Sequence, residues 1–358
     1  MIAAIRLCLI AVLWVWAAPV ALAKGGEVVF PAPQSEGARL TIWATIDLDA
    51  AQPLIHGYQK ENPHVAVLYR EMETLRLYED SLAGGDGRPD LTISSAMDLQ
   101  VKFVNDGHSR PYVSEATQRL PAWANWRNEA FAITLEPAVI VYNAQLGDPA
   151  LLPRTRAALA QMLTTHSAEL KGRVATYNIA ESGIGYLLAT HDTLHAGNIS
   201  TLLRSLGQVE VRLHCCTSNI LAGIERGEIL IGYNLLGSYA ATRQRRGAPI
   251  RIVRPEDFTL VISRVAVIPR TAKQPRLAGE FIDYVLSPEG RERLATEGLH
   301  ETSITSYVNS AASVAVEGET STAIQPVAIG PSLLVFLDRL KQRKFIQTWY
   351  ESLGRSPN

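Results

Sequence analysis

The chain has 358 residues, and its 34 Lys and Arg against 35 Asp and Glu give a formal net charge of −1. This balance offers no basic footprint, which argues against a protein that binds nucleic acid through its phosphates. The length also exceeds what one hydrophobic core usually serves, so we expect two lobes.

Residues 1–23 have the pattern of a secretory signal peptide. Arg6 supplies a positive charge, residues 7–15 are an unbroken apolar run, and Ala-Leu-Ala at 21–23 is a small-x-small cleavage site. The run is shorter than the roughly 20 apolar residues that a membrane anchor requires. We therefore expect cleavage after residue 23, a periplasmic location, and a flexible leader over residues 24–37.

From residue 38 onward, short apolar runs alternate with helical patterns. The first series predicts strands and helices at 39–44, 49–62, 65–69, 75–83, 90–94 and 97–105. A second series of the same rhythm predicts elements at 174–177, 184–190, 209–213, 220–226 and 229–233. This alternation predicts an α/β fold made of two Rossmann-like lobes with largely parallel sheets.

Two longer apolar segments, 133–142 and 258–268, lie at the boundaries between these series. We interpret both as crossover strands that form a two-strand hinge. The alternative is that both are ordinary core strands of one large sheet. The hinge interpretation assigns residues 38–136 and 266–300 to lobe 1 and residues 137–265 to lobe 2.

The C-terminal third continues with helical patterns at 275–286 and 288–296. Residues 302–324 are rich in Ser, Thr and Ala without periodicity, which predicts a long loop. Residues 331–353 predict an amphipathic helix or a pair of helices. We expect the whole segment 301–358 to pack on lobe 2.

Removal of the signal peptide leaves two cysteines, the adjacent pair Cys215 and Cys216. In an oxidising compartment such a pair could close only a small, strained ring. Our first interpretation is two buried thiols at a strand end. A vicinal disulfide and a soft-metal site remain as alternatives.

Several stretches match a known family in order and spacing. They are residues 40–47, 89–98, 140–143, 227–233 and 278–290, the last containing Ser-Pro-Glu-Gly. With these motifs the chain resembles the type II periplasmic solute-binding proteins, in particular the extracellular family of transporters for ferric iron and phosphorylated compounds. The resemblance implies a two-lobed clamp that closes on a small-molecule ligand. It also implies delivery to the membrane permease of an ABC transporter, or signalling to a membrane sensor kinase.

The sequence departs from the ferric-binding members of that family. Those members carry two adjacent tyrosines in the second lobe, whereas Tyr233 and Tyr239 here are six residues apart. The first-lobe turn at residues 44–47 also lacks a histidine. We therefore expect a small anionic solute that contains phosphorus. Ferric iron, bound by Tyr233 and Tyr239, is the alternative.

Ligands of open α/β sheets bind beyond the carboxyl ends of the strands. In the two predicted lobes, the polar or small residues at those ends are the candidates for ligand binding: Thr45, Asp47, Ser94, Ser95, Ala96, Tyr177, Ser182, Gly183, Thr217, Ser218, Tyr233 and Asn234.

Three of these candidate sites place Ser or Thr where a helix is predicted to begin. The unpaired N–H groups and the positive end of a helix dipole bind anions there, and hydroxyls add donors. At any single site the residue could instead serve only as a helix cap. Asp47 would repel an anion, and we interpret it as a cap of the helix near Asp49. Sequence alone does not place an arginine in the cleft, for which the candidates are Arg70, Arg110, Arg212 and Arg264.

No nucleophile elbow, zinc-protease motif, complete dinucleotide fingerprint or phosphate-binding loop occurs in the sequence. We therefore expect a monomeric binding protein that is not an enzyme and needs no cofactor. An enzyme on a similar fold is the remaining alternative, because fold does not determine function.

Overall fold

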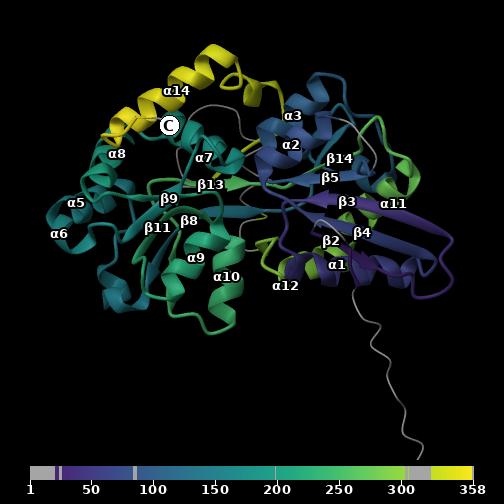
Figure 1. Cartoon of the computed structure of the whole chain (residues 1–358), viewed down its shortest axis with the longest axis horizontal. Coiled ribbons are helices and arrows are strands. Elements are labelled where there is room, and N and C mark those ends of the chain that lie inside the picture. Colours follow the sequence, from purple (N-terminus) through teal and green to yellow (C-terminus); the bar gives the residue numbers. More distant parts are fainter. Residues whose placement is uncertain are drawn as a thin grey trace, which may run out of the picture.

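The structure is a computed structural model that describes residues 21–23, 26–83, 87–197, 199–302, 305 and 324–356. Most of the predicted signal peptide and of the predicted loop at 302–324 lies outside these residues. Two α/β bodies lie side by side and are joined by strands that run between them (Figure 1). None of the described helices is both long and apolar enough to cross a membrane.

The lobe 1 sheet contains the parallel strands that the first series predicts, because β3 pairs in parallel with both β4 and β5. The leader prediction is wrong for residues 27–30, which form β2 antiparallel to β4 with Val28 and Phe30 buried. The sheet order is β1 (Ala21–Ala23), β2 (Glu27–Phe30), β4 (Val65–Glu71), β3 (Ala38–Ala44), β5 (Leu91–Ser94), β14 (Val265–Val267), β7 (Ala130–Ala132) and β6 (Asn125–Trp126).

The five longer helices of lobe 1 begin and end close to the predicted positions, and two short ones at 115–118 and 122–124 were not predicted. They are α1 (Leu48–Glu61), α2 (Thr74–Ala83), α3 (Met97–Asn105), α4 (Glu115–Gln118), η1 (Ala122–Ala124), α11 (Pro275–Leu286) and α12 (Pro288–Thr296). Proline at the first position starts α11, and Leu277 and Phe281 bury one face of it. The Ser287 side chain caps α12 by accepting from the Gly290 N–H at 3.1 Å.

Lobe 2 is built on a second sheet, in which β9 pairs in parallel with β10 and β11. Its order is β10 (Arg212–His214), β9 (Val174–Tyr177), β11 (Ile231–Leu236), β8 (Glu136–Asn143), β13 (Thr259–Ile262) and β15 (Ile324–Pro326), with β12 (Ile250–Val253) also paired to β8. Its helices are η2 (Ala144–Leu146), η3 (Pro149–Leu151), α5 (Arg156–Thr165), α6 (Ser167–Leu170), α7 (Gly183–His195), α8 (Ile199–Gln208), α9 (Thr217–Glu225) and α10 (Gly237–Arg245).

The chain crosses between the two sheets at two places. The first crossing leads from β7 to β8, and the second leads from β13 to β14 through Ser263 and Arg264. The apolar segment 133–142 contains the link after β7 and most of β8, whereas the segment 258–268 contains β13, the crossing and β14. The alternative of one large sheet is wrong, and the predicted two-lobed fold with two connecting segments is confirmed.

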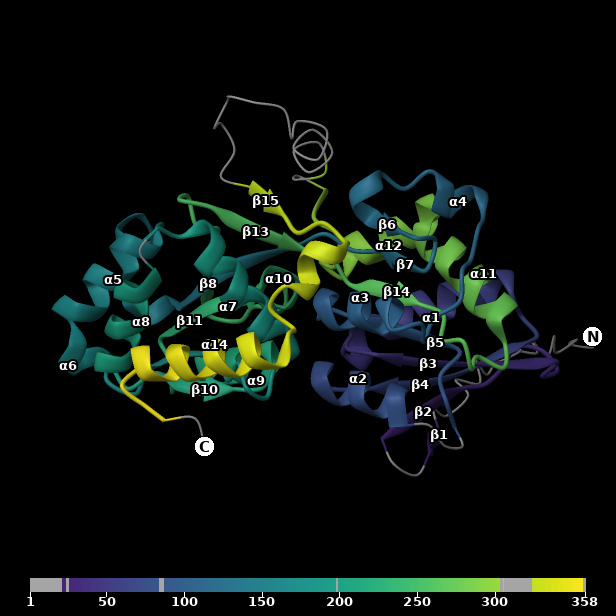
Figure 2. The same cartoon turned by 90° about the horizontal axis from the view of Figure 1, so that it is seen from above.

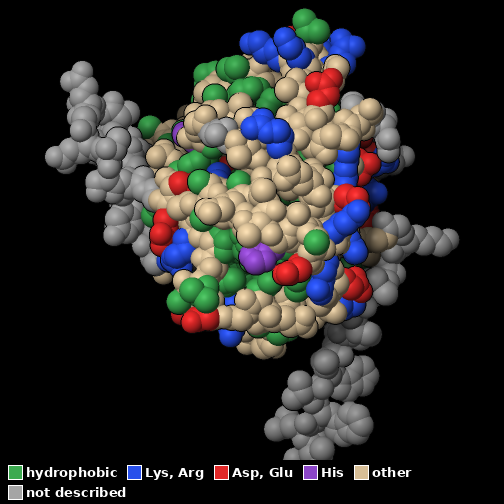
Figure 3. Space-filling view, turned by 90° about the vertical axis from the view of Figure 1, so that its left-hand side faces the viewer, with side chains coloured by type: hydrophobic (Ala, Val, Ile, Leu, Met, Phe, Trp, Pro, Cys, Tyr) green, Lys and Arg blue, Asp and Glu red, His purple; other side chains and the backbone are tan. Residues whose placement is uncertain are grey.

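The C-terminal segment after β15 reaches both lobes (Figure 2). Helix α14 (Arg339–Ser352) packs on α8 of lobe 2 and buries Trp349 and Tyr350, as expected. However, η5 (Pro331–Leu334) packs on α3 of lobe 1, so the expectation that the whole segment lies on lobe 2 is wrong. Basic side chains gather along the outer edge of the molecule where α14 lies, and its Lys341, Arg343 and Lys344 are exposed (Figure 3).

Candidate ligand-binding cleft

A polar cavity of about 290 Å³ lies where the strand ends of the two lobes face each other. Lobe 1 contributes Thr45, Asp47 and Ser95, and lobe 2 contributes Thr217 and Ser218. A wider hollow of about 700 Å³ adjoins it and shares Asp47, Glu71 and Tyr239 with it. Five of the twelve predicted ligand residues thus line one cavity.

The floor of the cavity in lobe 1 is built from two strand ends. Thr45, just beyond β3, accepts through Oγ1 from the backbone N–H of Ser95 at 3.1 Å. Ser94 instead turns inward, where its Oγ accepts from the N–H of Ala96 at 3.2 Å. Ser94 and Ala96 are therefore buried parts of the β5–α3 turn and do not line the cavity.

The side chain of Asp47 reaches across to lobe 2. Asp47 occupies the N-cap position of α1, but its side chain makes no capping hydrogen bond in the described structure. Its carboxylate accepts from the Ser218 hydroxyl at 2.7 Å. The Glu71 carboxylate accepts from the Leu48 N–H at 2.8 Å, at the start of α1. The capping interpretation of Asp47 is therefore wrong, because the Glu71 carboxylate accepts the hydrogen bond at the start of α1. The Asp47 side chain lies in the cleft instead.

The helix starts of lobe 2 differ in their environment. At α7, Ser182 accepts from the Gly185 N–H at 3.2 Å, and the Gly183 N–H donates to Thr74 of lobe 1 at 2.9 Å. The first turn of α7 is thus already satisfied, and the simple capping interpretation holds there. At α9, the side chain of Cys216 makes no capping hydrogen bond among the described contacts. Since residues 217–219 line the cavity, the first turn of α9 faces it.

Tyr177 contacts the first residue of α9. Its hydroxyl lies 2.5 Å from the Oγ1 of Thr217, and its ring is buried in lobe 2. It is not among the residues that line the cavity. Tyr177 therefore supports the position of Thr217 instead of reaching the cleft itself.

Tyr233 and Asn234 lie inside lobe 2, which corrects their assignment to the cleft. The Tyr233 hydroxyl donates to Asp192 at 2.7 Å and accepts from Arg156 Nε at 2.9 Å. The Asn234 amide also donates to Asp192, at 2.8 Å. The strand β11 shifts register between Gly232 and Leu235, and this irregularity directs both side chains toward the lobe interior.

Tyr239 makes a different set of contacts from Tyr233. Its hydroxyl donates to the Thr45 carbonyl at 3.2 Å and accepts from the Asp47 N–H at 3.3 Å. Burial raises the pKa of both phenols, so each is a neutral hydroxyl. Because the two hydroxyls belong to separate clusters, they do not form the shared oxygen site that iron would need.

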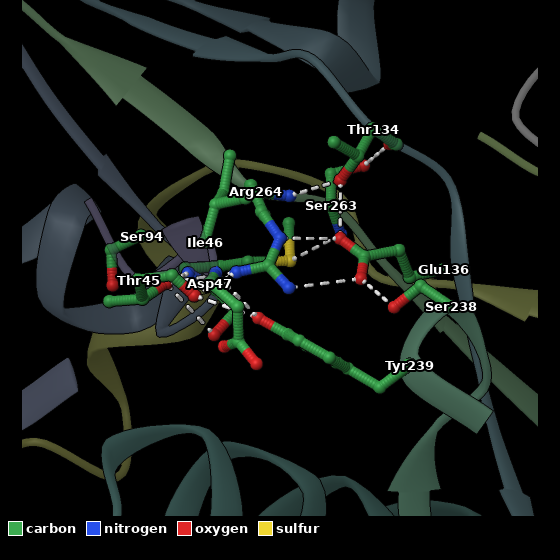
Figure 4. Close-up of polar contacts among 12 residues, drawn as sticks. Thr45, Ile46, Asp47, Ser94, Thr134, Glu136, Ser238, Tyr239, Ser263 and Arg264 are labelled. Atoms are coloured by element: carbon green, nitrogen blue, oxygen red, sulfur yellow. Dashed lines mark hydrogen bonds and ion pairs between the residues drawn. The ribbon is translucent and has the colours of Figure 1, made fainter. Parts of the chain in front are cut away.

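A buried ion pair connects the hinge to the cavity floor (Figure 4). Arg264, between β13 and β14, donates from Nε to Glu136 of β8 at 2.9 Å, and both side chains are fully buried. Arg264 Nη1 also donates to Thr45, with Oγ1 at 3.1 Å. Of the four candidate arginines, Arg264 thus lies directly beneath the cleft, with its charge already paired.

The lobe 1 wall of the cavity is acidic. Asp47, Glu71 and Glu73 line it, and none of the described lining residues is Lys or Arg. Burial, followed by the negative charges of Asp47, Glu73 and Asp49, raises the pKa of the Glu71 carboxyl. Carboxylates placed this close favour a bound positive group.

Sequence reasoning missed Glu71, Glu73 and the neighbouring Thr74. The expected strand at 65–69 stops two residues before β4 does, so the residues beyond its true carboxyl end were not among the candidates. These residues could have been found by the rule that ligands bind beyond the carboxyl ends of the strands, which had already located the ends of β3 and β5. It would have placed the end of a third parallel strand at the same edge.

Two α/β lobes joined by two crossing segments, with a polar cavity between them, define a clamp-type binding protein. The chain belongs to the bacterial extracellular solute-binding proteins, whose family model matches residues 40–300. None of the curated proteins matches the sequence.

Solved structures share this fold. The substrate binding protein of the ABC transporter from Agrobacterium tumefaciens is 34% identical, with a TM-score of 0.83, and the match covers 94% of this chain and 100% of that one. AfuA from Actinobacillus pleuropneumoniae, solved with fructose-6-phosphate, is 15% identical over 89% and 99% of the two chains, with a TM-score of 0.69. Iron-bound HitA from Pseudomonas aeruginosa is 16% identical over 72% and 84%, with a TM-score of 0.60.

Proposed function

We propose that this protein is the periplasmic substrate-binding component of an ABC-type uptake system, exported by the signal peptide at residues 1–23. It captures a small solute as a monomer, without cofactor or catalysis, and delivers it to a membrane permease. Family membership and the likeness to the Agrobacterium substrate binding protein support this role. The cavity between the lobes supports it independently, because a ligand held there contacts both lobes at once.

The two walls of the cavity differ in electrostatic character, and this observation carries our inference about the ligand. Lobe 1 presents three carboxylates, whereas lobe 2 presents the uncapped first turn of α9 with its N–H groups and hydroxyls. A helix start favours an anionic group, and a carboxylate wall favours a cationic one. We therefore revise the expected ligand from a simple anion to a zwitterion, with an amine toward lobe 1 and a phosphonate or phosphate toward α9.

Direct hydrogen bonds already join the lobes around the cavity. They link Ser218 to Asp47, Gly183 to Thr74, and Tyr239 to Thr45. A ligand that bridges the same two walls would add to these contacts and shift the population toward the closed form. Arg264 connects the hinge to Thr45, so hinge position and cavity floor would change together.

A thermal-shift comparison of three matched probes tests this ligand class on the chain from residue 24 onward. The probes are 2-aminoethylphosphonate, ethylphosphonate and ethanolamine, so that only the first carries both charges. At 100 times its Kd, a ligand adds about 2.7 kcal/mol of stability. We expect a rise of roughly 2–4 °C or more with the zwitterion and smaller rises with the other two.

The variant Asp47→Asn should weaken binding of the zwitterion about tenfold, the effect of about 1.4 kcal/mol. Asp148→Asn is the matched control, because Asp148 caps the distant η3. A larger shift with ethylphosphonate than with the zwitterion would contradict the role of the carboxylates. A shift with Fe(III) and a tyrosinate colour would establish the iron alternative instead.

A further inference from the structure

Three side chains of the cavity form a compact cluster, of which the proposed function uses only the negative charge of Glu73. Glu73 lies between β4 and α2 of lobe 1, and Cys215 and Cys216 lie between β10 and α9 of lobe 2. One carboxylate oxygen and the two sulfur atoms all lie within 4.8 Å of one another. The cluster therefore brings together ligand atoms from both walls of the cleft.

Two sulfur atoms and one carboxylate oxygen are a donor set for a thiophilic cation. Zn²⁺ binds thiolates at about 2.3 Å and carboxylates at about 2.0–2.2 Å, so one ion can reach atoms separated as these are. Magnesium and calcium prefer oxygen donors alone. The donor set thus favours soft or borderline cations over magnesium and calcium.

The surroundings of the two cysteines fit metal ligation. Both are free thiols and half-buried, so they are neither disulfide-bonded nor sealed in the core. The Asn219 amide donates to Cys215 Sγ at 3.2 Å, and Cys216 holds the N-cap position of α9. Hydrogen-bond donors and a helix start both stabilise thiolates.

Without a cation, the same cluster is electrostatically unfavourable. The Glu73 carboxylate oxygen lies within 4.8 Å of both sulfur atoms, so its negative charge opposes formation of a thiolate until a cation binds. A divalent cation would displace the thiol proton and compensate the negative charge of Glu73. Proton release on metal binding is the usual behaviour of cysteine sites.

We propose that Glu73, Cys215 and Cys216 form a binding site for a thiophilic divalent cation, of the Zn²⁺ or Cd²⁺ type, that links the two lobes. Three protein ligands leave one position of a tetrahedral site open to solvent or to an anionic group of the solute. The site shares Glu73 with the carboxylate wall, but it does not require the proposed zwitterion.

Titration of the reduced mature chain with Cd²⁺ alone tests the proposal. A phosphine keeps the thiols reduced without competing as a thiol ligand. We expect one equivalent to bind, with a sulfur-to-cadmium charge-transfer band in the ultraviolet. Scattering should also show a smaller radius of gyration with Cd²⁺, because the ligands come from both lobes.

Three variants separate ligation from general charge. The double variant Cys215→Ser with Cys216→Ser should lose the band. Glu73→Gln should keep the band, lose the compaction, and weaken affinity by at least about tenfold, the effect that loss of even an outer partner has. Glu71→Gln removes a neighbouring charge of the same cavity and should change affinity no more than about threefold, as a screened charge does.

Four results would overturn the proposal. They are Cd²⁺ binding unchanged in the double cysteine variant, equal effects of Glu73→Gln and Glu71→Gln, absence of free thiols in the untreated protein, and arsenite binding without Cd²⁺ binding. The zwitterion shift, measured separately on the double cysteine variant, distinguishes failure of this site from failure of the proposed solute.

Discussion

At the scale of single residues, buried charged side chains are the positions where a substitution or a change of pH has the largest effect on stability. Arg264 and Glu136 are both fully buried, and Thr134 and Ser238 donate further hydrogen bonds to the Glu136 carboxylate. Such a pair adds little net stability, but loss of one partner leaves an uncompensated charge. The pair therefore fixes one geometry for the crossing segments, and the sequence alone could name Arg264 only as one of four candidates.

Asp98 makes the folded state sensitive to pH. It is 3% exposed in α3, and burial raises its pKa to about 7 from an ordinary 3.8. Burial raises the pKa of Tyr78 in α2 and of Tyr186 in α7, and the negative charge of Asp98 adds to the rise in both. Asp98 therefore lies near the contact between the lobes. Between these two pKa values the folded chain holds a proton that the unfolded chain releases. The free energy of unfolding therefore falls as pH rises through this window.

We predict that Asp98→Asn flattens this dependence and raises stability above the folded-state pKa. In Asp98→Asn, the fall of the free energy of unfolding with pH should be smaller than in the unaltered protein, by up to about 1.4 kcal/mol per pH unit within the window. Urea unfolding over a pH series measures it. Asp106→Asn is the control, because its pKa is lowered beside Lys102, so its contribution has the opposite sign. An unchanged slope in Asp98→Asn would show that other groups cause the dependence.

At the scale of elements, the contact between α8 and α14 joins the C-terminal helix to lobe 2. A methyl group on Gly207 of α8 would lie 2.5 Å from the Leu353 carbonyl oxygen, and the contact is with backbone. Gly207 is therefore needed for the close approach of the chain after α14.

Gly207→Ala should destabilise lobe 2 by about 1–3 kcal/mol, the usual cost of overpacking. The expected signs are a lower Tm and earlier proteolytic removal of the C-terminal helix. Gly197→Ala is matched to it, because nothing lies within 4 Å of a methyl group there. Equal Tm values for the two variants would mean that α14 moves aside without cost.

Elements with strong local signals were predictable from sequence, and those shaped by distant contacts were not. Helices α3, α11 and α12 start where Pro or a strand end places them, and their predicted bounds agree. Helix α8 was missed, and a strand was expected at 209–213, because Val209 and Val211 are buried in a turn before β10. The predicted strand ends correctly identified five residues that line the cavity. The inward direction of the Tyr233 side chain was not predictable, because it depends on the irregular pairing of β8 with β11.

At the scale of the whole molecule, a few contacts hold the lobes together. The Tyr239 hydroxyl bonds both to the Thr45 carbonyl and to the Asp47 N–H. Tyr239→Phe should remove about 1 kcal/mol from the closed form, which shifts the closed-to-open ratio about fivefold. We expect a larger radius of gyration for the solute-free protein in solution scattering.

The matched control for this prediction is Tyr142→Phe. The Tyr142 hydroxyl donates to the Pro153 carbonyl at 2.8 Å, entirely within lobe 2. Its loss should leave the radius of gyration unchanged. If the two variants scatter alike, the Tyr239 hydroxyl does not govern closure.

The strand order of lobe 1 also has a consequence for the nascent chain. β14 lies between β5 and β7, yet it is made only at residues 265–267, after nearly all of lobe 2. The sheet of lobe 1 therefore cannot be completed until β14 has been synthesised. The lobe 2 strands from β8 to β13 are contiguous in sequence and can pair without lobe 1. Since local pairing is faster than pairing over long separations, the lobe made second should be the first to fold.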